Sequence, residues 1–145
     1  MDKIHLVECP RDALQGWPHE VSLEDKFGYY KTLYSVGFDT LDMGSFVSPK
    51  AIPSMADTPE VIELLEEEGI IPNSKTRSLV IVANQRGAED ASKYSVIDDL
   101  GFPLSLSETF QQRNTKASIS EGFKRLEGIQ NICTNHQKRL VVYLS

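Results

Sequence analysis

Residues 4–15 read Ile-His-Leu-Val-Glu-Cys-Pro-Arg-Asp-Ala-Leu-Gln, an apolar run followed at once by an arginine and an aspartate. The run from Ile4 to Cys9 lacks strict alternation of apolar and polar residues, which predicts a strand buried on both faces of a sheet. Arg11 and Asp12 would then emerge at the C-terminal end of the strand, where parallel α/β folds carry their chemistry. Adjacent opposite charges are also typical of a solvated turn.

Four more strand-like segments follow this run, at residues 40–46, 79–84, 102–108 and 140–144. Helical patterns separate them, and strands connected in this way form a parallel sheet with right-handed crossovers. This order fits either a five-stranded doubly wound sheet or the first part of a (β/α)8 barrel. The length of the chain alone favours the doubly wound sheet.

The expected helix starts carry capping signals. Ser22 and Ser118 each precede an acidic residue by three positions, which is the capping-box pattern, and Thr58 stands before a proline as a natural N-cap. A short helix is expected over 85–95. Residues 111–117 are polar and are expected to form a loop.

Composition limits the function classes. The 145 residues are 40% apolar, enough for one packed domain, and the net charge of −6 without a basic aromatic cluster argues against nucleic acid. No apolar run approaches the roughly 18 residues that a membrane span requires. Cys9 and Cys133, in a chain that shows no signal peptide, predict reduced thiols in a cytoplasmic protein, and both are expected to serve packing.

Two common kinds of site are missing from the sequence. The segment Arg86-Gly87-Ala88-Glu89 lacks the glycine and lysine spacing of a phosphate-binding loop, which argues against a nucleotide cofactor. The three histidines are scattered without a second ligand at metal spacing, which argues against a histidine-rich zinc site.

Polar residues instead gather where the expected strands end. Carboxylates and a fixed cation at one mouth of a sheet suit a hard divalent cation and a small anionic substrate. The residues concerned are Arg11, Asp12, Asp42, Ser45, Asn84, Ser107 and Glu108.

Two motifs in the sequence, Pro10-Arg11-Asp12-Ala13-Leu14-Gln15 and Ser45-Phe46-Val47-Ser48-Pro49-Lys50, resemble hydroxymethylglutaryl-CoA lyase. The resemblance continues through residues 84, 107–108, 114 and 118–121 to the fifth strand. It implies a TIM barrel, of which 1–145 would be the N-terminal part of an incomplete barrel, with about five strands and four helices. It further implies cleavage of an acyl-CoA thioester into acetoacetate and acetyl-CoA with Mg²⁺ or Mn²⁺.

The resemblance also implies roles for single residues. Asp12 would be a metal ligand, and Arg11 would bind the thioester carbonyl oxygen and stabilise the enolate. Asp42, where the family usually has glutamate, would hold this arrangement together. Gln15, Ser45 and Asn114 are weaker candidates for substrate contact.

The chain departs from the family pattern in three ways. Cys9 and Ala13 replace glycines beside the first motif. Asp42 is one methylene shorter than glutamate, so a backbone shift or a bridging water is expected to bring it to Arg11. The family's two metal-binding histidines, its metal-ligand asparagine and its catalytic cysteine lie beyond the fifth strand, so the 145 residues alone are expected to be inactive or nearly so.

Two other functions stay open from the sequence. One is a condensing enzyme of the same superfamily, similar to isopropylmalate or citramalate synthase, although the motif at residues 9–15 favours the lyase branch. The other is a non-catalytic α/β binding module. Five barrel strands would leave open edges, which a homodimer could close.

Overall fold

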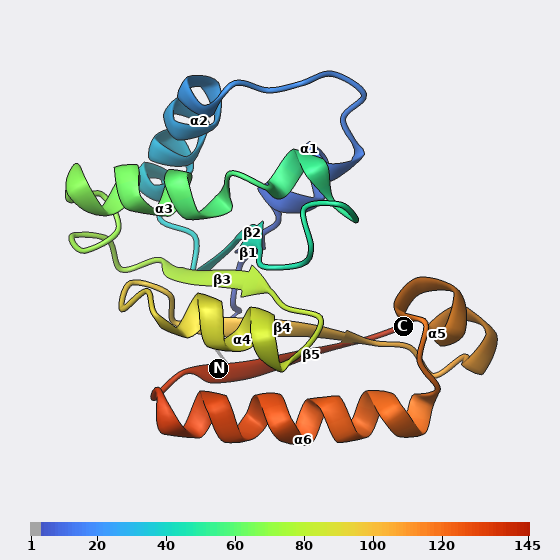
Figure 1. Ribbon diagram of the computed structural model, residues 1–145. Helices are drawn as coiled ribbons and strands as arrows, with labels where there is room; N and C mark the ends of the chain where they lie inside the picture. Colours follow the sequence, from blue (N-terminus) through green and yellow to red (C-terminus); the bar gives the residue numbers. More distant parts are fainter. Residues whose placement is uncertain (1–3) are drawn as a thin grey trace.

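The five strands follow one another across a single parallel sheet in chain order, β1-β2-β3-β4-β5. The computed structural model describes residues 4–145 (Figure 1). The order never reverses, and the sheet curls into a half-barrel, so the doubly wound alternative is wrong and the barrel interpretation is confirmed. The strands are β1 (Val7–Glu8), β2 (Thr40–Ser45), β3 (Arg77–Ile81), β4 (Asp99–Leu104) and β5 (Arg139–Leu144).

Helices cover the convex face of the sheet and flank the C-terminal ends of its strands (Figure 1). They are α1 (Pro10–Gly16), α2 (Leu23–Val36), α3 (Thr58–Glu67), α4 (Gln85–Ser92), α5 (Glu108–Thr115) and α6 (Ile119–Asn135), with a 3-10 turn at Pro53–Met55. Two short helices, α1 and α5, therefore add to the four that the sequence predicts. Each begins favourably: Pro10 provides a preset φ at the start of α1, and Ser107 caps α5.

The predicted helix starts are largely confirmed. Ser22 accepts a hydrogen bond from the backbone N–H of Asp25, and Ser118 forms a complete capping box with Glu121. Thr58, however, is the first helical residue of α3 rather than its cap. Its hydroxyl donates to the carbonyl of Met55 and accepts from the backbone N–H of Ser45, so it ties α3 to β2.

Three local predictions are wrong. β1 spans only two residues at the edge of the sheet, and its apolar side chains are exposed rather than buried on both faces. β4 starts at Asp99 instead of 102, and residues 111–115 belong to α5 instead of a loop. Helix α5 was missed because its sequence is polar, yet Gln111 turns inward and accepts a hydrogen bond from the backbone N–H of Ser105.

The core lies between the sheet and its helices. Outward-facing residues of the central strands, such as Leu41, Val80 and Leu100, pack against helical residues such as Ile62 and make one cluster. Cys133 is fully buried in this cluster, as predicted. The alternate strand residues face the concave side, which is where the polar groups of the candidate site lie.

An ion-pair triad crosses the concave face at the N-terminal ends of the strands. Asp99 is fully buried and accepts two hydrogen bonds each from Arg77 on β3 and Arg139 on β5. The four contacts use both carboxylate oxygens, so the buried charge is fully compensated. This compensation explains how a strand can start on an aspartate.

Candidate active site

Arg11 and Asp42 form a bidentate ion pair on the concave side of the sheet. Arg11 Nε donates to Oδ1 and Nη2 donates to Oδ2, both at 2.8 Å. The carboxylate is fully buried, and the arginine side chain is 14% exposed. Because both partners are held in one plane, the guanidinium has little freedom to rotate and keeps its remaining N–H groups in fixed directions.

Two local features bring this pair together. Pro10 starts α1 directly after β1, which places Arg11 in the first turn above the sheet. The pairing of β2 with β3 shifts by one position between Asp42 and Gly44, a β-bulge immediately after the aspartate. Asp42 reaches Arg11 directly, so no bridging water is needed, and the bulge is a suitable source of the expected backbone shift.

The ion pair affects the pKa values of Arg11 and of the neighbouring Cys9. Burial by itself lowers the pKa of Arg11, but the hydrogen bond and the charge of Asp42 outweigh it, so the pKa is raised. The guanidinium is therefore a permanent cation in this site. Burial, followed by the charge of Asp42, raises the pKa of the neighbouring Cys9 thiol, which keeps it protonated and argues against a thiolate nucleophile at Cys9.

Tyr143 is a third member that the sequence did not reveal. Its hydroxyl donates to Oδ2 of Asp42 at 3.4 Å from the opposite end of the sheet. A Cβ on Gly101 would come within 3.0 Å of the Tyr143 ring, so the glycine on β4 leaves the space through which Tyr143 passes. Burial raises the pKa of Tyr143, which keeps it a neutral hydrogen-bond donor. Only the fold brings residues 101 positions apart together.

The other polar residues of the first motif, Asp12 and Gln15, face solvent. Asp12 is 78% exposed and lies 3.7 Å from Nη1 of Arg11, while the exposed side chain of Gln15 accepts a hydrogen bond from Nη1 at 3.0 Å. Asp12 is therefore beside the ion pair but free to bind a ligand. Gln15 therefore accepts a third hydrogen bond from the Arg11 guanidinium, in addition to the two that Asp42 accepts.

The described residues do not make a metal site on their own. No three His, Cys, Asp or Glu side chains within 4–145 come together in a way that could hold a metal ion. Asp12 supplies one exposed carboxylate, and Asp42 is already occupied by Arg11. A complete magnesium or manganese site therefore does not fit the residues present.

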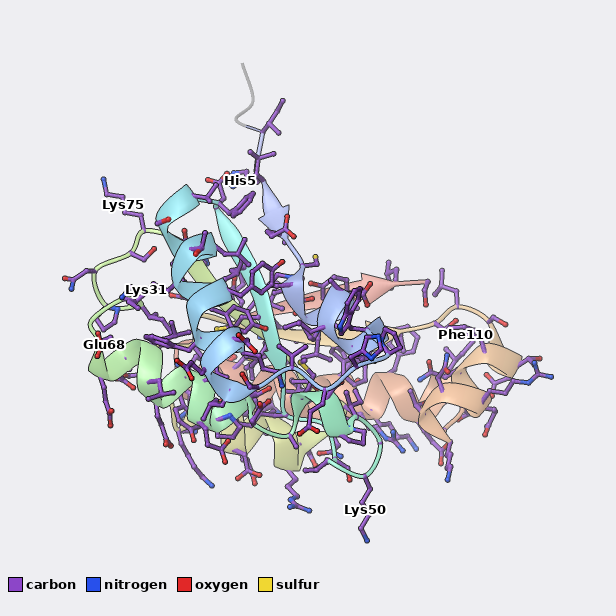
Figure 2. All side chains as sticks on the ribbon, turned by 90° about the horizontal axis from the view of Figure 1, so that it is seen from above. His5, Lys31, Lys50, Glu68, Lys75 and Phe110 are labelled. Carbon is purple, nitrogen blue, oxygen red and sulfur yellow. The ribbon has the colours of Figure 1, made fainter. Side chains whose placement is uncertain are left out.

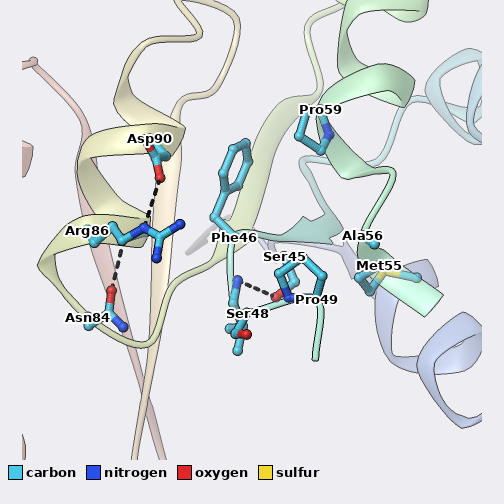
Figure 3. Close-up of a pocket in the computed structure, with 12 residues that line it drawn as sticks. Ser45, Phe46, Ser48, Pro49, Met55, Ala56, Pro59, Asn84, Arg86 and Asp90 are labelled. Carbon is cyan, nitrogen blue, oxygen red and sulfur yellow. Dashed lines mark hydrogen bonds and ion pairs between the residues drawn. The ribbon is translucent and has the colours of Figure 1, made fainter. Parts of the chain in front are cut away.

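A cavity of about 250 Å³ opens at the C-terminal ends of β2 and β3 (Figure 3). The motif at Ser45–Pro49 lies between the first turns of α4 on one side and Met55, Ala56 and Pro59 on the other. Ser45 follows Asp42 by three positions on β2 and lines the cavity, whereas Arg11 and Asp42 are not among the residues that line it. The lining residues are Ser45, Phe46, Val47, Ser48, Pro49, Met55, Ala56, Pro59, Asn84, Arg86, Gly87 and Asp90.

The cavity walls are fixed by close backbone contacts. Asn84 caps α4 by accepting from the N–H of Gly87, and Ser45 Oγ accepts from the N–H of Val47 (Figure 3). A Cβ on Gly87 would come within 2.5 Å of the carbonyl oxygen of Phe46. The cavity therefore depends on a glycine at this position. Ser45 has a structural role here in addition to its place in the lining.

Arg86 is an exposed charge at the rim of this cavity. Its side chain is almost fully exposed, and its Nε lies 3.8 Å from Asp90 (Figure 3). Lys50, the last residue of the second motif, is exposed and points away from the body of the molecule (Figure 2). In the sequence Arg86 belongs only to a segment that lacks phosphate-loop spacing. Its place at the cavity depends on residues from distant parts of the chain.

The remaining candidates do not join the ion pair. Ser107 caps α5, and Glu108 accepts from the backbone N–H of Ile119, so both hold the α5–α6 connection. Asn114 is exposed on the last turn of α5, and no polar contact in the described part of the chain links it to Arg11 or Asp42.

The chain is similar to known lyases over almost its whole length. It is 33% identical to 3-hydroxy-3-isohexenylglutaryl-CoA/hydroxymethylglutaryl-CoA lyase of Pseudomonas aeruginosa over 99% of the chain and 46% of that protein. It is 31% identical to hydroxymethylglutaryl-CoA lyase YngG of Bacillus subtilis, again over 99% of the chain and 46% of the relative. The chain thus spans about half the length of the curated relatives it matches. No family model matches.

Solved structures give the same result. The Bacillus subtilis hydroxymethylglutaryl-CoA lyase matches with a TM-score of 0.88 at 29% identity, covering 98% of this chain and 46% of that one. The Pseudomonas aeruginosa lyase matches with a TM-score of 0.86 at 32% identity and the same coverage. The resemblance to hydroxymethylglutaryl-CoA lyase is confirmed. Because the chain covers less than half of each lyase, their activity is not carried over directly.

The match to hydroxymethylglutaryl-CoA lyases shows which known fold the half-barrel belongs to. These lyases are TIM barrels, and the five strands correspond to an N-terminal portion of such a barrel. A related lyase structure, from Acinetobacter baumannii, contains coenzyme A and 3-methylmalate. None of the helices within 4–145 has the length and apolar content required to span a bilayer.

Proposed function

We propose that this chain supplies the acyl-thioester-binding half of a hydroxymethylglutaryl-CoA lyase site. The observation that carries the proposal is the bidentate pair of Arg11 and Asp42, a permanent cation held rigid at the C-terminal ends of barrel strands. The substrate is an acyl-CoA thioester, which would be cleaved to acetoacetate and acetyl-CoA.

Arg11 acts by charge stabilisation. When the carbon–carbon bond breaks, the C3 hydroxyl loses its proton to water and becomes the ketone of acetoacetate. The electron pair of the broken bond moves onto the α-carbon of the thioester and is shared with its carbonyl oxygen, where negative charge grows until the α-carbon takes up a proton to give acetyl-CoA. A guanidinium already fixed by Asp42 stabilises this charge without having to reorient. Tyr143 and Gln15 contact the two ends of the pair and act as positioning residues, since their contacts are with Asp42 and Arg11.

The cavity beside Ser45 is the proposed place for the coenzyme A portion. The cavity extends from Ser45, which lies on the same strand as Asp42, to Arg86, whose exposed guanidinium suits a phosphate group. Asn114 lies on α5 at the same ends of the strands and stays a weaker candidate for substrate contact.

Asp12 is proposed as one carboxylate ligand of Mg²⁺ or Mn²⁺. Its exposed side chain fits that role, but the remaining ligands are not among the described residues. A cytoplasmic location is also part of the proposal, because Cys9 and Cys133 are both free thiols, as is usual in reducing compartments.

Calorimetric titration with coenzyme A and with hydroxymethylglutaryl-CoA tests the proposal. We expect both to bind, and Arg86→Ala to weaken both by about tenfold through the loss of a phosphate contact. Arg11→Gln should weaken only the acylated ligand. Lys75→Ala, which removes an exposed charge in the loop before β3, is the matched control. Equal binding of both ligands by all variants would contradict the proposal.

A further inference from the structure

A polar cavity lies where the strands begin, at the end of the sheet opposite the candidate active site. The strand arrows in Figure 1 point away from this end. The cavity is formed by the start of β3, the end of α4, the loop before β4 and the turn between α6 and β5. Its volume is about 440 Å³, and small-ligand sites commonly measure roughly 300–1,000 Å³. The cavity is therefore large enough for a small organic ligand.

More basic than acidic side chains line this cavity. The basic ones are Arg77, Lys93 and Lys138, beside His136, and the one carboxylate is that of Asp98. Asp98 is already engaged, because its Oδ2 accepts from the backbone N–H of Ser78 at 2.8 Å and its Oδ1 lies 4.0 Å from Nη1 of Arg77. The cavity is thus positively charged, although the whole chain has a net charge of −6.

Neighbouring carboxylates leave part of this charge uncompensated. The buried Asp99 is shared by two guanidinium groups, those of Arg77 and Arg139, so it balances only one of them. Lys93 donates to Asp90 at 2.6 Å, but its side chain is 71% exposed and can reach other acceptors. Exposed pairs of this kind hold their partners weakly.

Lys138 is a partly buried cation whose hydrogen bonds go to neutral groups. Its ammonium group donates to the carbonyls of Tyr94 at 2.8 Å, of Ser95 at 3.4 Å and of Ile97, and it forms no ion pair within residues 4–145. Burial lowers the pKa of Lys138, as expected for a cation that has lost water without gaining a counter-charge. An anion in the cavity would supply that counter-charge.

Ser92 provides an unpaired hydroxyl at the same cavity. The residue is 7% exposed, and its Oγ has no hydrogen-bond partner among residues 4–145. A serine within a helix often donates to the carbonyl four residues before it, but Ser92, the last residue of α4, does not. A buried hydroxyl without a partner is unfavourable, and a ligand oxygen would satisfy it.

We propose that this cavity binds a small phosphate-bearing anion. A phosphate monoester carries about 1.5–2 negative charges near pH 7 and three acceptor oxygens, which matches the excess of bases and the free hydroxyl. Lys93 and Arg77 bind the phosphate oxygens, and Ser92 donates a hydrogen bond. Lys138 contributes its charge, and its long bond to Ser95 is the one that a ligand oxygen most easily replaces. The site is separate from the proposed thioester site and does not depend on it.

NMR titration of the whole chain tests the proposal. Inorganic phosphate and glycerol phosphate are added separately, with NaCl adjusted to keep the ionic strength constant. Saturable shifts of the amides of 92–98 and 136–138 are expected, while the amides of 84–87, beside the exposed Arg86, serve as an internal comparison. Binding of both compounds would assign a monoester site, and binding of inorganic phosphate alone would assign a site for the free anion.

A different reading of the same charges gives the opposite result. The carbonyl ends of α4 and α6 lie near this cavity, and cations stabilise helix C-termini without any ligand. If the bases do only that, neither compound will produce saturable shifts at 92–98 and 136–138. That outcome would overturn the proposal.

Two variants separate binding from stability. Ser92→Ala removes a hydroxyl that has no partner, so it should leave Tm unchanged or raised while weakening phosphate binding by about fivefold. Lys93→Ala changes an exposed side chain and should weaken binding by about tenfold. Lys124→Ala, at an exposed position near the other end of α6, is the matched control and should bind like the parent chain. Parent-like binding by both Ser92→Ala and Lys93→Ala would contradict the assigned site.

Discussion

Arg11 and Asp42 are 31 positions apart in the chain and are joined by two parallel hydrogen bonds of 2.8 Å. One partner comes from the first turn of a helix and the other from the middle of the second strand. The pair fastens α1 to the sheet and at the same time presents a fixed cation at the mouth of the half-barrel. Stability and proposed chemistry therefore depend on the same contact.

Replacing Asp42 by Asn should destabilise the chain by about 2–4 kcal/mol, because the mostly buried guanidinium loses its counter-charge. Urea unfolding measures the effect. Asp12→Asn is the matched control, since that carboxylate is largely exposed, and it should change stability by less than about 0.5 kcal/mol. Equal effects of the two changes would show that the ion pair does not hold α1.

Asp42→Glu introduces the residue that the lyase resemblance leads one to expect. Here the shorter aspartate already reaches Arg11 directly in a fully buried position, so an added methylene has no space and should cost about 1–3 kcal/mol. Thermal unfolding of the two proteins tests this. A more stable glutamate variant would show that the bulge after Asp42 relaxes easily.

The purified chain with magnesium should show no lyase turnover with hydroxymethylglutaryl-CoA. The described residues provide one exposed carboxylate near Arg11 and no group of three metal-binding side chains. Release of acetoacetate can be followed by a coupled assay. Turnover of about 1 per second or more, which is ordinary for enzymes, would refute the need for further ligands.

Gly87→Ala should destabilise the chain by about 1–3 kcal/mol and narrow the cavity, because the new Cβ would press against the backbone oxygen of Phe46. Gly28→Ala is the control. It lies within α2 with no atom near the added methyl, and should be neutral or stabilising by up to about 1 kcal/mol. Thermal unfolding compares the two, and equal Tm changes would contradict this account.

Stability should fall at alkaline pH because two buried tyrosines resist ionisation. Burial raises the pKa of Tyr30 and Tyr34 above the ordinary value of about 10. Below about pH 10 both tyrosines are protonated in the folded and in the unfolded state, so their ionisation does not reduce the free energy of unfolding. Above it only the unfolded tyrosines lose protons, so each buried tyrosine reduces stability by about 1.4 kcal/mol per pH unit. Urea unfolding between pH 9 and 11 should show this slope, and Tyr34→Phe should reduce it.

The sequence predicted features that depend on neighbouring residues. The capping box of Ser118 and Glu121 and the burial of Cys133 both follow from local patterns, and both are confirmed. The lyase motifs predicted the barrel correctly where chain length favoured another sheet. Arg11 and Asp42 were also paired correctly, although the directness of their contact was not foreseen.

The errors arise where distant residues decide the structure. The fourth strand was predicted to begin at Phe102, but it begins at Asp99, whose buried charge is compensated by Arg77 and Arg139, 22 and 40 positions away. The first strand was expected to be buried because its sequence is apolar, yet it lies at an edge. Tyr143 reaches Asp42 only because β4 has a glycine between them.

The strands lie in the sheet in the same order in which they are synthesised. Each new strand pairs with the one made just before it, so the half-barrel can grow from its first strand while later residues are still being added. Loop closures stay short at every step, which favours fast folding. The contact from Tyr143 to Asp42 is the exception, since it forms only after the fifth strand has emerged. The carboxylate that orients Arg11 therefore acquires its last polar partner at the end of translation of these 145 residues.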